Sequence, residues 1–179
     1  MTAIDQWAFT APFEGIIPHI YLDSEGLPTC GVGFLIATAA ECAKLPWLPS
    51  RQAALADYEQ VRAQPKGFRA PHYKAFCKAH LSDVAMRQIF ADKVEAFRRD
   101  LKRTGWELER YPEAAQIGIV DLAYNMGVAR LNKGFISFKP AVIAGDWVRA
   151  AAECRRKKPV SDERNEATRK LFLSVANAA

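Results

Sequence analysis

The sequence predicts an α+β fold that is mainly α-helical, with a small N-terminal β-hairpin lobe and a helical C-terminal lobe. Residues 19–23 alternate between apolar and polar, a Ser-Glu-Gly turn follows, and residues 27–36 return with two glycines, as in a hairpin whose second strand is bent. After residue 37 the chain carries helical periodicity and capping residues instead. A sheet this small cannot form its own core, so we expect it to pack on helices.

Helix starts and stops are marked by Ser, Pro and Gly. Pro12 is expected to end or bend the first helix just before Glu14. Ser50 and Ser82 are good N-caps, and Gly105 and Gly127 are terminators. The helices are expected over residues 4–9, 38–44, 51–63, 83–103, 112–126, 140–144, 146–156 and 162–175, with an irregular stretch at 65–80.

Length and composition limit the class of protein. The 179 residues suit a single domain, here divided into residues 1–80 and 81–179. The net charge of +5 favours polyanionic partners, among them the acidic polymers of a bacterial envelope. No apolar run is long enough to span a membrane, and the N-terminus lacks the basic and apolar regions of a signal peptide.

Cysteine and histidine spacing argues against a metal or a cofactor. Four cysteines show no C-x-x-C pairing, so buried free thiols are expected, with a disulfide formed after export as the alternative. His19, His72 and His80 stand in no metal-ligand motif. We therefore expect no metal site and no cofactor.

The chemistry is concentrated in residues 13–33, FEGIIPHIYLDSEGLPTCGVG. Glu14 follows a helix, Asp23 ends a strand, and Thr29 lies six positions further on. Hydrolysis of a sugar polymer needs one acid to protonate the leaving oxygen and a second carboxylate to handle water or the developing positive charge. Asp23 is equally suited to an Asx turn, and Thr29 to an ordinary strand position, so these readings stay open beside the catalytic one.

This segment resembles the catalytic signature of the T-even phage-type lysozyme and endolysin family, glycoside hydrolase family 24. Residues 88–101, 121–135 and 164–172 are also similar to that family, so the resemblance covers about residues 4–36 and 81–175. It implies a lysozyme-like two-lobe fold with Glu14, Asp23 and Thr29 as catalytic residues. It also implies that Arg164 supports the catalytic Glu. The substrate-binding residues expected with them are Tyr21, Gly31, Gly33, Leu35, Tyr124 and Asn125.

Three departures from the family pattern stand out, and the first is Pro12 just before Glu14. Phe34 occupies a position where the family usually has His, although that His is structural rather than catalytic. Residues 37–80 are longer than the corresponding family segment and do not align with it. We expect them to form a lid or an additional wall of the cleft rather than core.

The leading functional hypothesis is a muramidase that hydrolyses the β-1,4 bond between N-acetylmuramic acid and N-acetylglucosamine in peptidoglycan, and so lyses bacteria. The alternatives are a lytic transglycosylase, which needs one acid/base Glu and no water-positioning Asp, and a non-catalytic cell-wall-binding module. The expected partner is bacterial peptidoglycan, bound by a monomer, with no nucleic acid and no membrane span.

The expected site of action is the periplasm or the cell wall, although the chain is made in the cytoplasm without a signal peptide. Holin-type release would suit a phage endolysin, whereas delivery by a secretion system such as type VI would suit an antibacterial toxin effector. The second setting would bring an immunity protein or a secretion-machine carrier as a further partner. The sequence does not choose between the two.

Overall fold

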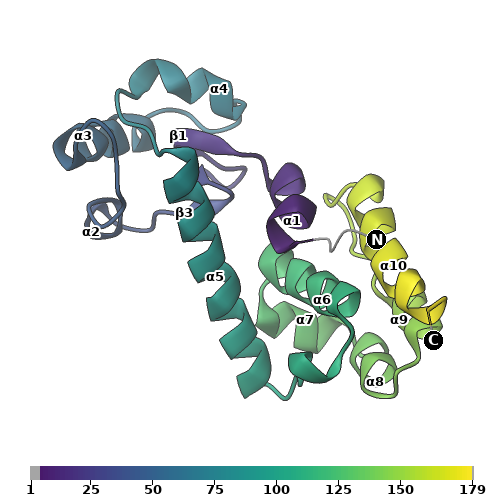
Figure 1. Ribbon diagram of the computed structural model, residues 1–179. Coiled ribbons are helices and arrows are strands. Elements are labelled where there is room, and N and C mark those ends of the chain that lie inside the picture. Colours follow the sequence, from purple (N-terminus) through teal and green to yellow (C-terminus); the bar gives the residue numbers. More distant parts are fainter. Residues whose placement is uncertain (1–4, 179) are drawn as a thin grey trace. The chain divides into compact units, whose positions relative to one another are not determined.

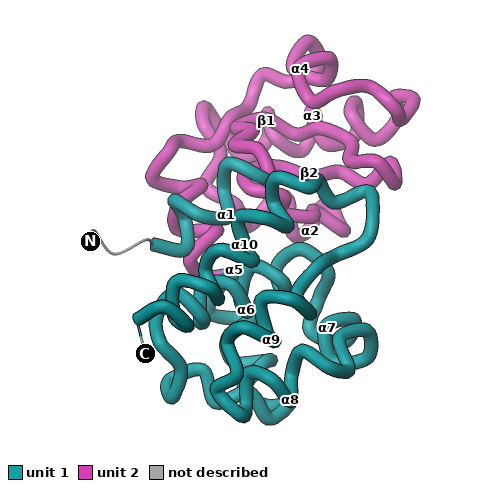
Figure 2. The backbone as a smooth tube through the Cα atoms, turned by 90° about the vertical axis from the view of Figure 1, so that its right-hand side faces the viewer, with its two compact units in different colours: residues 1–13, 93–179 teal, residues 14–92 magenta. Residues whose placement is uncertain are grey.

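The computed structural model describes residues 5–178 (Figure 1) and divides into two compact units (Figure 2). Unit 1 contains the described residues up to Phe13 and those from Lys93 onward, and unit 2 contains Glu14–Asp92. The boundary therefore falls inside the long helix rather than at residue 80. Each unit is described by itself below.

The architecture is mainly helical with one three-stranded antiparallel sheet of order β1-β2-β3, which confirms the predicted α+β class. The elements in chain order are α1 (Gln6–Glu14), β1 (Ile17–Leu22), β2 (Pro28–Gly31), β3 (Phe34–Leu35), α2 (Ala39–Cys42), α3 (Arg51–Arg62), α4 (Ala70–Tyr73), η1 (Lys74–Phe76), α5 (Asp83–Arg103), η2 (Leu108–Arg110), α6 (Glu113–Met126), α7 (Val128–Gly134), α8 (Phe138–Ile143), α9 (Trp147–Glu153) and α10 (Asp162–Ala176).

The first helix differs from the prediction, because α1 continues through Pro12 to Glu14. Proline removes one backbone donor, which would have bonded the carbonyl of Ala8. Ala8 is exposed, so water can satisfy that carbonyl and the break is not enforced. Gly15, with a φ of +82°, follows the last helical residue in the left-handed conformation that commonly ends a helix. The predicted position of Glu14 at a helix end is thus correct, although Gly15 rather than Pro12 ends the helix.

The sheet has three strands instead of the predicted hairpin with one bent strand. Gly31 and Gly33 both have a φ of +60°, a conformation that side chains disfavour, so the chain reverses at Val32 and Gly33. β3 then pairs with β2 through Thr29 opposite Leu35 and Cys30 opposite Phe34. β2 is the central strand, and all four of its residues are buried.

Residues 37–80 form part of the core of unit 2, which overturns the expectation of a lid. Helices α3 and α4 pack against β1 (Figure 1). Thr38 and Ser50 cap α2 and α3, as the Ser50 prediction required. The segment buries apolar side chains that a lid would leave exposed, namely Cys42, Trp47, Ala54, Tyr58, Val61, Tyr73 and Ala79. The burial of these side chains makes the segment structural.

Unit 1 is built around α6, as its apolar sequence predicted. Nine of its fourteen residues are buried, and α7 and α10 pack against it. At Gly118 a Cβ atom would lie 2.7 Å from the Phe172 ring, so the glycine allows α10 to approach the α6 backbone closely. Helix α7, which directly follows Gly127, is an element that the sequence did not predict.

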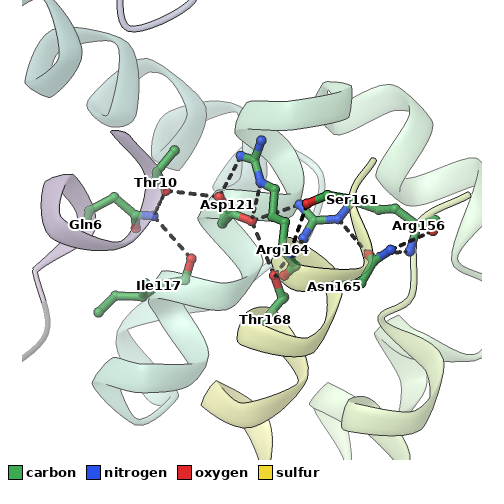
Figure 3. Close-up of polar contacts among 9 residues, drawn as sticks. All are labelled: Gln6, Thr10, Ile117, Asp121, Arg156, Ser161, Arg164, Asn165 and Thr168. Atoms are coloured by element: carbon green, nitrogen blue, oxygen red, sulfur yellow. Dashed lines mark hydrogen bonds and ion pairs between the residues drawn. The ribbon is translucent and has the colours of Figure 1, made fainter. Parts of the chain in front are cut away.

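A buried ionic cluster joins three parts of unit 1 (Figure 3). Asp121, fully buried in the middle of α6, accepts hydrogen bonds from Arg164 at 2.7 Å and from Arg156 at 2.8 Å. The Thr10 hydroxyl donates to the same carboxylate at 3.0 Å, which ties α1 to α6. Removing Asp121 would take away the buried carboxylate that Arg156 and Arg164 share, so the cluster specifies how these segments pack.

Within residues 5–178, no helix combines the length and the apolar character that crossing a membrane requires.

Candidate active site

Glu14 lies against the turn between β2 and β3. A Cβ atom added to Gly33 would stand 3.1 Å from Oε2 of Glu14, closer than side chains normally tolerate. Glycine at position 33 therefore has two effects. It permits the positive φ of the turn, and it leaves the space that the Glu14 carboxyl occupies. The side chain of Glu14 is only partly exposed.

One face of the sheet carries three of the predicted residues in a row. Tyr21 is directly opposite Thr29 on β2, and Thr29 is directly opposite Leu35 on β3. Opposed residues of antiparallel strands project to the same face. Asp23 is two positions beyond Tyr21, and its backbone N–H continues the ladder by donating to Leu27 at 3.0 Å, so Asp23 shares that face.

Asp23 combines the two roles that the sequence left open. Its Oδ1 accepts hydrogen bonds from the backbone N–H groups of Glu25 at 2.9 Å and Leu27 at 2.8 Å, which is an Asx-type turn. Its Oδ2 makes no hydrogen bond with the described part of the chain. One oxygen thus fixes the carboxylate, and the other is available to accept a hydrogen bond from a water molecule.

Thr29 is buried, and its hydroxyl donates to the carbonyl of Leu27 at 3.0 Å. The proton of this hydroxyl is therefore committed to the turn. Its oxygen retains lone pairs, so a water near Thr29 would act as the donor.

Tyr21 is electrostatically coupled to both carboxylates. The pKa of Tyr21 is raised to about 12, mainly by burial, with smaller contributions from interactions with Cys30, Glu14 and Asp23 in that order. Glu14 and Asp23 therefore act on the same phenol group from two segments of unit 2. At neutral pH Tyr21 therefore carries a neutral hydroxyl.

The three remaining predicted residues belong to unit 1. Tyr124 lies near the C-terminal end of α6, where Phe97 packs on its ring and the Lys93 ammonium group stands 4.3 Å from the ring centroid. Asn125 follows it in the same helix. Their contact with a saccharide and with the unit 2 residues stays a prediction.

Arg164 has a role that the sequence missed. It is buried, binds Asp121 through two nitrogen atoms, and places its guanidinium group 5.5 Å from the centre of the Phe13 ring. Its support of Glu14 stays a prediction. The missed residue is Asp121, and the available signal was an acidic residue in the middle of the apolar run IGIVDLAY.

Three of the four cysteines are poor nucleophiles at neutral pH. All four are free thiols, as predicted, and three of them are buried. Burial raises the pKa of Cys77 to about 12 and the pKa values of Cys42 and Cys154 to about 11, so these groups stay protonated at neutral pH. Among residues 5–178 no group of His, Cys, Asp or Glu side chains is arranged to hold a metal ion.

Comparison with known proteins found a distant relative in a phage. The chain is 25% identical over 142 residues to the pre-baseplate central spike protein Gp5 of Enterobacteria phage T4. The aligned region is 76% of this chain and 22% of that protein, so the chain spans about a fifth of the spike protein's length. No protein-family model matches the chain. The relationship is therefore distant and partial, and family membership is not established by it.

Proposed function

We propose that this protein is a peptidoglycan hydrolase of the muramidase type, with Glu14 as the general acid and Asp23 as the carboxylate that holds the attacking water. The observation that supports the proposal is that Glu14 and Asp23, from two segments of unit 2, both raise the pKa of Tyr21, while the Glu14 carboxyl lies against Gly33. The distant similarity to a baseplate spike protein of a T-even phage adds support, because the motif resembles lysozymes of the same phage group.

The proposed reaction divides the work between these side chains. Glu14 gives its proton to the glycosidic oxygen as the bond to the sugar C1 breaks. A water held by Oδ2 of Asp23 and by the Thr29 oxygen adds to C1 and passes its proton to Asp23. The phenol of Tyr21 stays neutral and adds no charge of its own to the site. Attack by water without a covalent intermediate would invert the anomeric centre.

Digestion of purified peptidoglycan tests the proposal. The products of a muramidase carry reducing N-acetylmuramic ends, whereas a lytic transglycosylase produces 1,6-anhydro ends, and mass spectrometry separates the two. NMR of the first-formed anomer tests the inversion. Glu14→Gln keeps the shape of the side chain but cannot donate a proton to the leaving oxygen, so wall digestion should fall by about 10²- to 10⁴-fold while the fold is retained.

The alternatives predict different results. A wall-binding module would leave the glycan intact while sedimenting with it. A folded Glu14→Gln variant that digests peptidoglycan at a near-normal rate would remove the basis for assigning Glu14.

The delivery route follows as a separate proposal. A domain similar to part of a phage baseplate spike protein would reach peptidoglycan by injection, which suits a phage or an antibacterial effector. An immunity protein or a spike-like carrier would be its partner in the effector setting.

A further inference from the structure

A pocket in unit 2 contains charged and polar side chains that the proposed hydrolysis does not use. It has a volume of about 320 Å³ and is formed by the start of β1 and the segment after α4. The side chains that argue for a ligand are those of His19, Lys74, Lys78 and His80. Neither Glu14 nor Asp23 lines it.

His19 is the buried polar group of this pocket. Only 8% of it is exposed, and its Nε2–H donates to the backbone carbonyl of Ala70 at 2.9 Å. With Nε2 committed as the donor, Nδ1 of the neutral ring is an acceptor. Nδ1 makes no hydrogen bond with residues 5–178, so it is available as an acceptor on a ring that lines the same pocket as Lys74 and Lys78.

The segment that carries Lys74 and Lys78 is strongly basic. Residues 61–82 contain five Lys and Arg residues and no Asp or Glu. The carboxylate packed against this segment is Asp57, which is buried and accepts hydrogen bonds from the backbone N–H groups of Lys78 at 2.8 Å and Ala79 at 2.6 Å. Asp57 therefore holds the backbone in place, while the two ammonium groups extend from exposed residues.

Cys77 does not make this pocket a reactive site. Its thiol donates to the carbonyl of Ile20 at 3.3 Å, and its pKa is raised to about 12 by burial and by Asp57. The pocket thus favours binding over covalent chemistry.

We propose that this pocket binds the free carboxylates of peptidoglycan stem peptides, as a second contact with the polymer that is cleaved at Glu14. The lysines meet the carboxylate, and Nδ1 of His19 accepts a hydrogen bond from a neighbouring peptide N–H. A phosphodiester would supply the negative charge for the lysines but has no N–H or O–H to donate to Nδ1 of His19. A peptide with a free carboxylate supplies both, so the pocket favours a peptide. This proposal rests on the proposed function for the identity of the polymer.

Binding to intact sacculi is the first test. In the Glu14→Gln background, which should leave the wall undigested, Lys74→Gln/Lys78→Gln is compared with Lys133→Gln/Lys157→Gln. The control removes the same charge from two exposed lysines of unit 1. At low salt, sedimentation with sacculi should weaken about tenfold for the pocket variant and stay within about twofold for the control. Equal weakening in both variants would show a general charge effect and overturn the proposal.

NMR with soluble probes identifies the chemistry. A synthetic stem tripeptide with free carboxylates should shift the amide resonances of residues 74–80, and its fully amidated form should not. Equal shifts with the amidated peptide, or stronger shifts with inorganic phosphate, would overturn the assignment to carboxylates. Digestion by the unaltered protein tests the proposed function separately. If the protein binds the tripeptide but digests no peptidoglycan, the assignment of this binding site stands and the hydrolase proposal is refuted.

Discussion

The close contact between Gly33 and Glu14 allows the position of the proposed general acid to be tested from its neighbour. In Gly33→Ala the new Cβ would stand 3.1 Å from Oε2 of Glu14, so the carboxyl group must move by a few tenths of an ångström. The φ of +60° adds a backbone cost of about 1–2 kcal/mol in the free energy of unfolding. Both effects come from one added methyl group.

The expected loss of activity follows from the size of the displacement. A misplacement of about 1 Å in a reacting group costs about 10²-fold in rate, so a shift of a few tenths of an ångström should lower kcat about three- to tenfold. The rate of peptidoglycan digestion under saturating substrate measures kcat, and thermal unfolding measures the stability change separately.

Gly145→Ala is the matched control for backbone strain. Gly145 has a φ of +71°, and a Cβ there would meet no atom within 4 Å. It should lose a similar free energy of unfolding, about 1–2 kcal/mol, and keep its activity. If both variants digest peptidoglycan at the unaltered rate although both are destabilised, the carboxyl of Glu14 does not act at the position described here.

Three further predictions concern other parts of the molecule. Asp23→Asn keeps the Oδ1 acceptor of the turn but loses the charge, so it should unfold normally and digest peptidoglycan about 10²-fold more slowly, whereas Asp23→Ala should also lose about 1–2 kcal/mol in an unfolding titration. Asp121→Asn should cost about 3–5 kcal/mol, because it leaves Arg156 and Arg164 buried without a full counter-charge. In contrast, loss of the exposed Glu166–Arg169 pair should leave the denaturation midpoint unchanged. The pKa of Tyr21 is raised to about 12 in the folded state, whereas the unfolded chain releases this proton near pH 10. The free energy of unfolding should therefore fall as the pH rises from about 10 to 12. Tyr21→Phe should flatten that decline, and an identical slope in both proteins would refute the link to Tyr21.

Local sequence signals predicted most helices, because their starts and stops depend on nearby residues. Ser50 and Ser82 accept hydrogen bonds from backbone amides three positions ahead, and both helices begin where these residues predicted. Gly127 ends α6 as expected. The turn at Asp23 was also predictable, since its carboxylate bonds to backbone atoms only two and four positions away.

The predictions from sequence that failed have a common cause. In each case the outcome depended on residues that are distant in the chain or on solvent exposure. Pro12 did not end α1, and we attribute this to the exposure of Ala8, because water can then bond the carbonyl that Pro12 leaves without its helical donor. The residues between 37 and 80 joined the core because α3 and α4 pack on β1, a contact that no local pattern encodes.

By itself, therefore, the sequence determined the helical capping, the hairpin turn and the identity of the carboxylates, which all rest on short-range hydrogen bonding and residue chemistry. Only the tertiary structure decided that β2 and β3 are separate strands, that Gly33 makes room for Glu14, and that Arg164 binds Asp121. The physical reason is that burial and the pairing of charges are set by atoms brought together from remote parts of the chain. Asp121 and Arg164, for example, are 43 positions apart and 2.7 Å from each other in space.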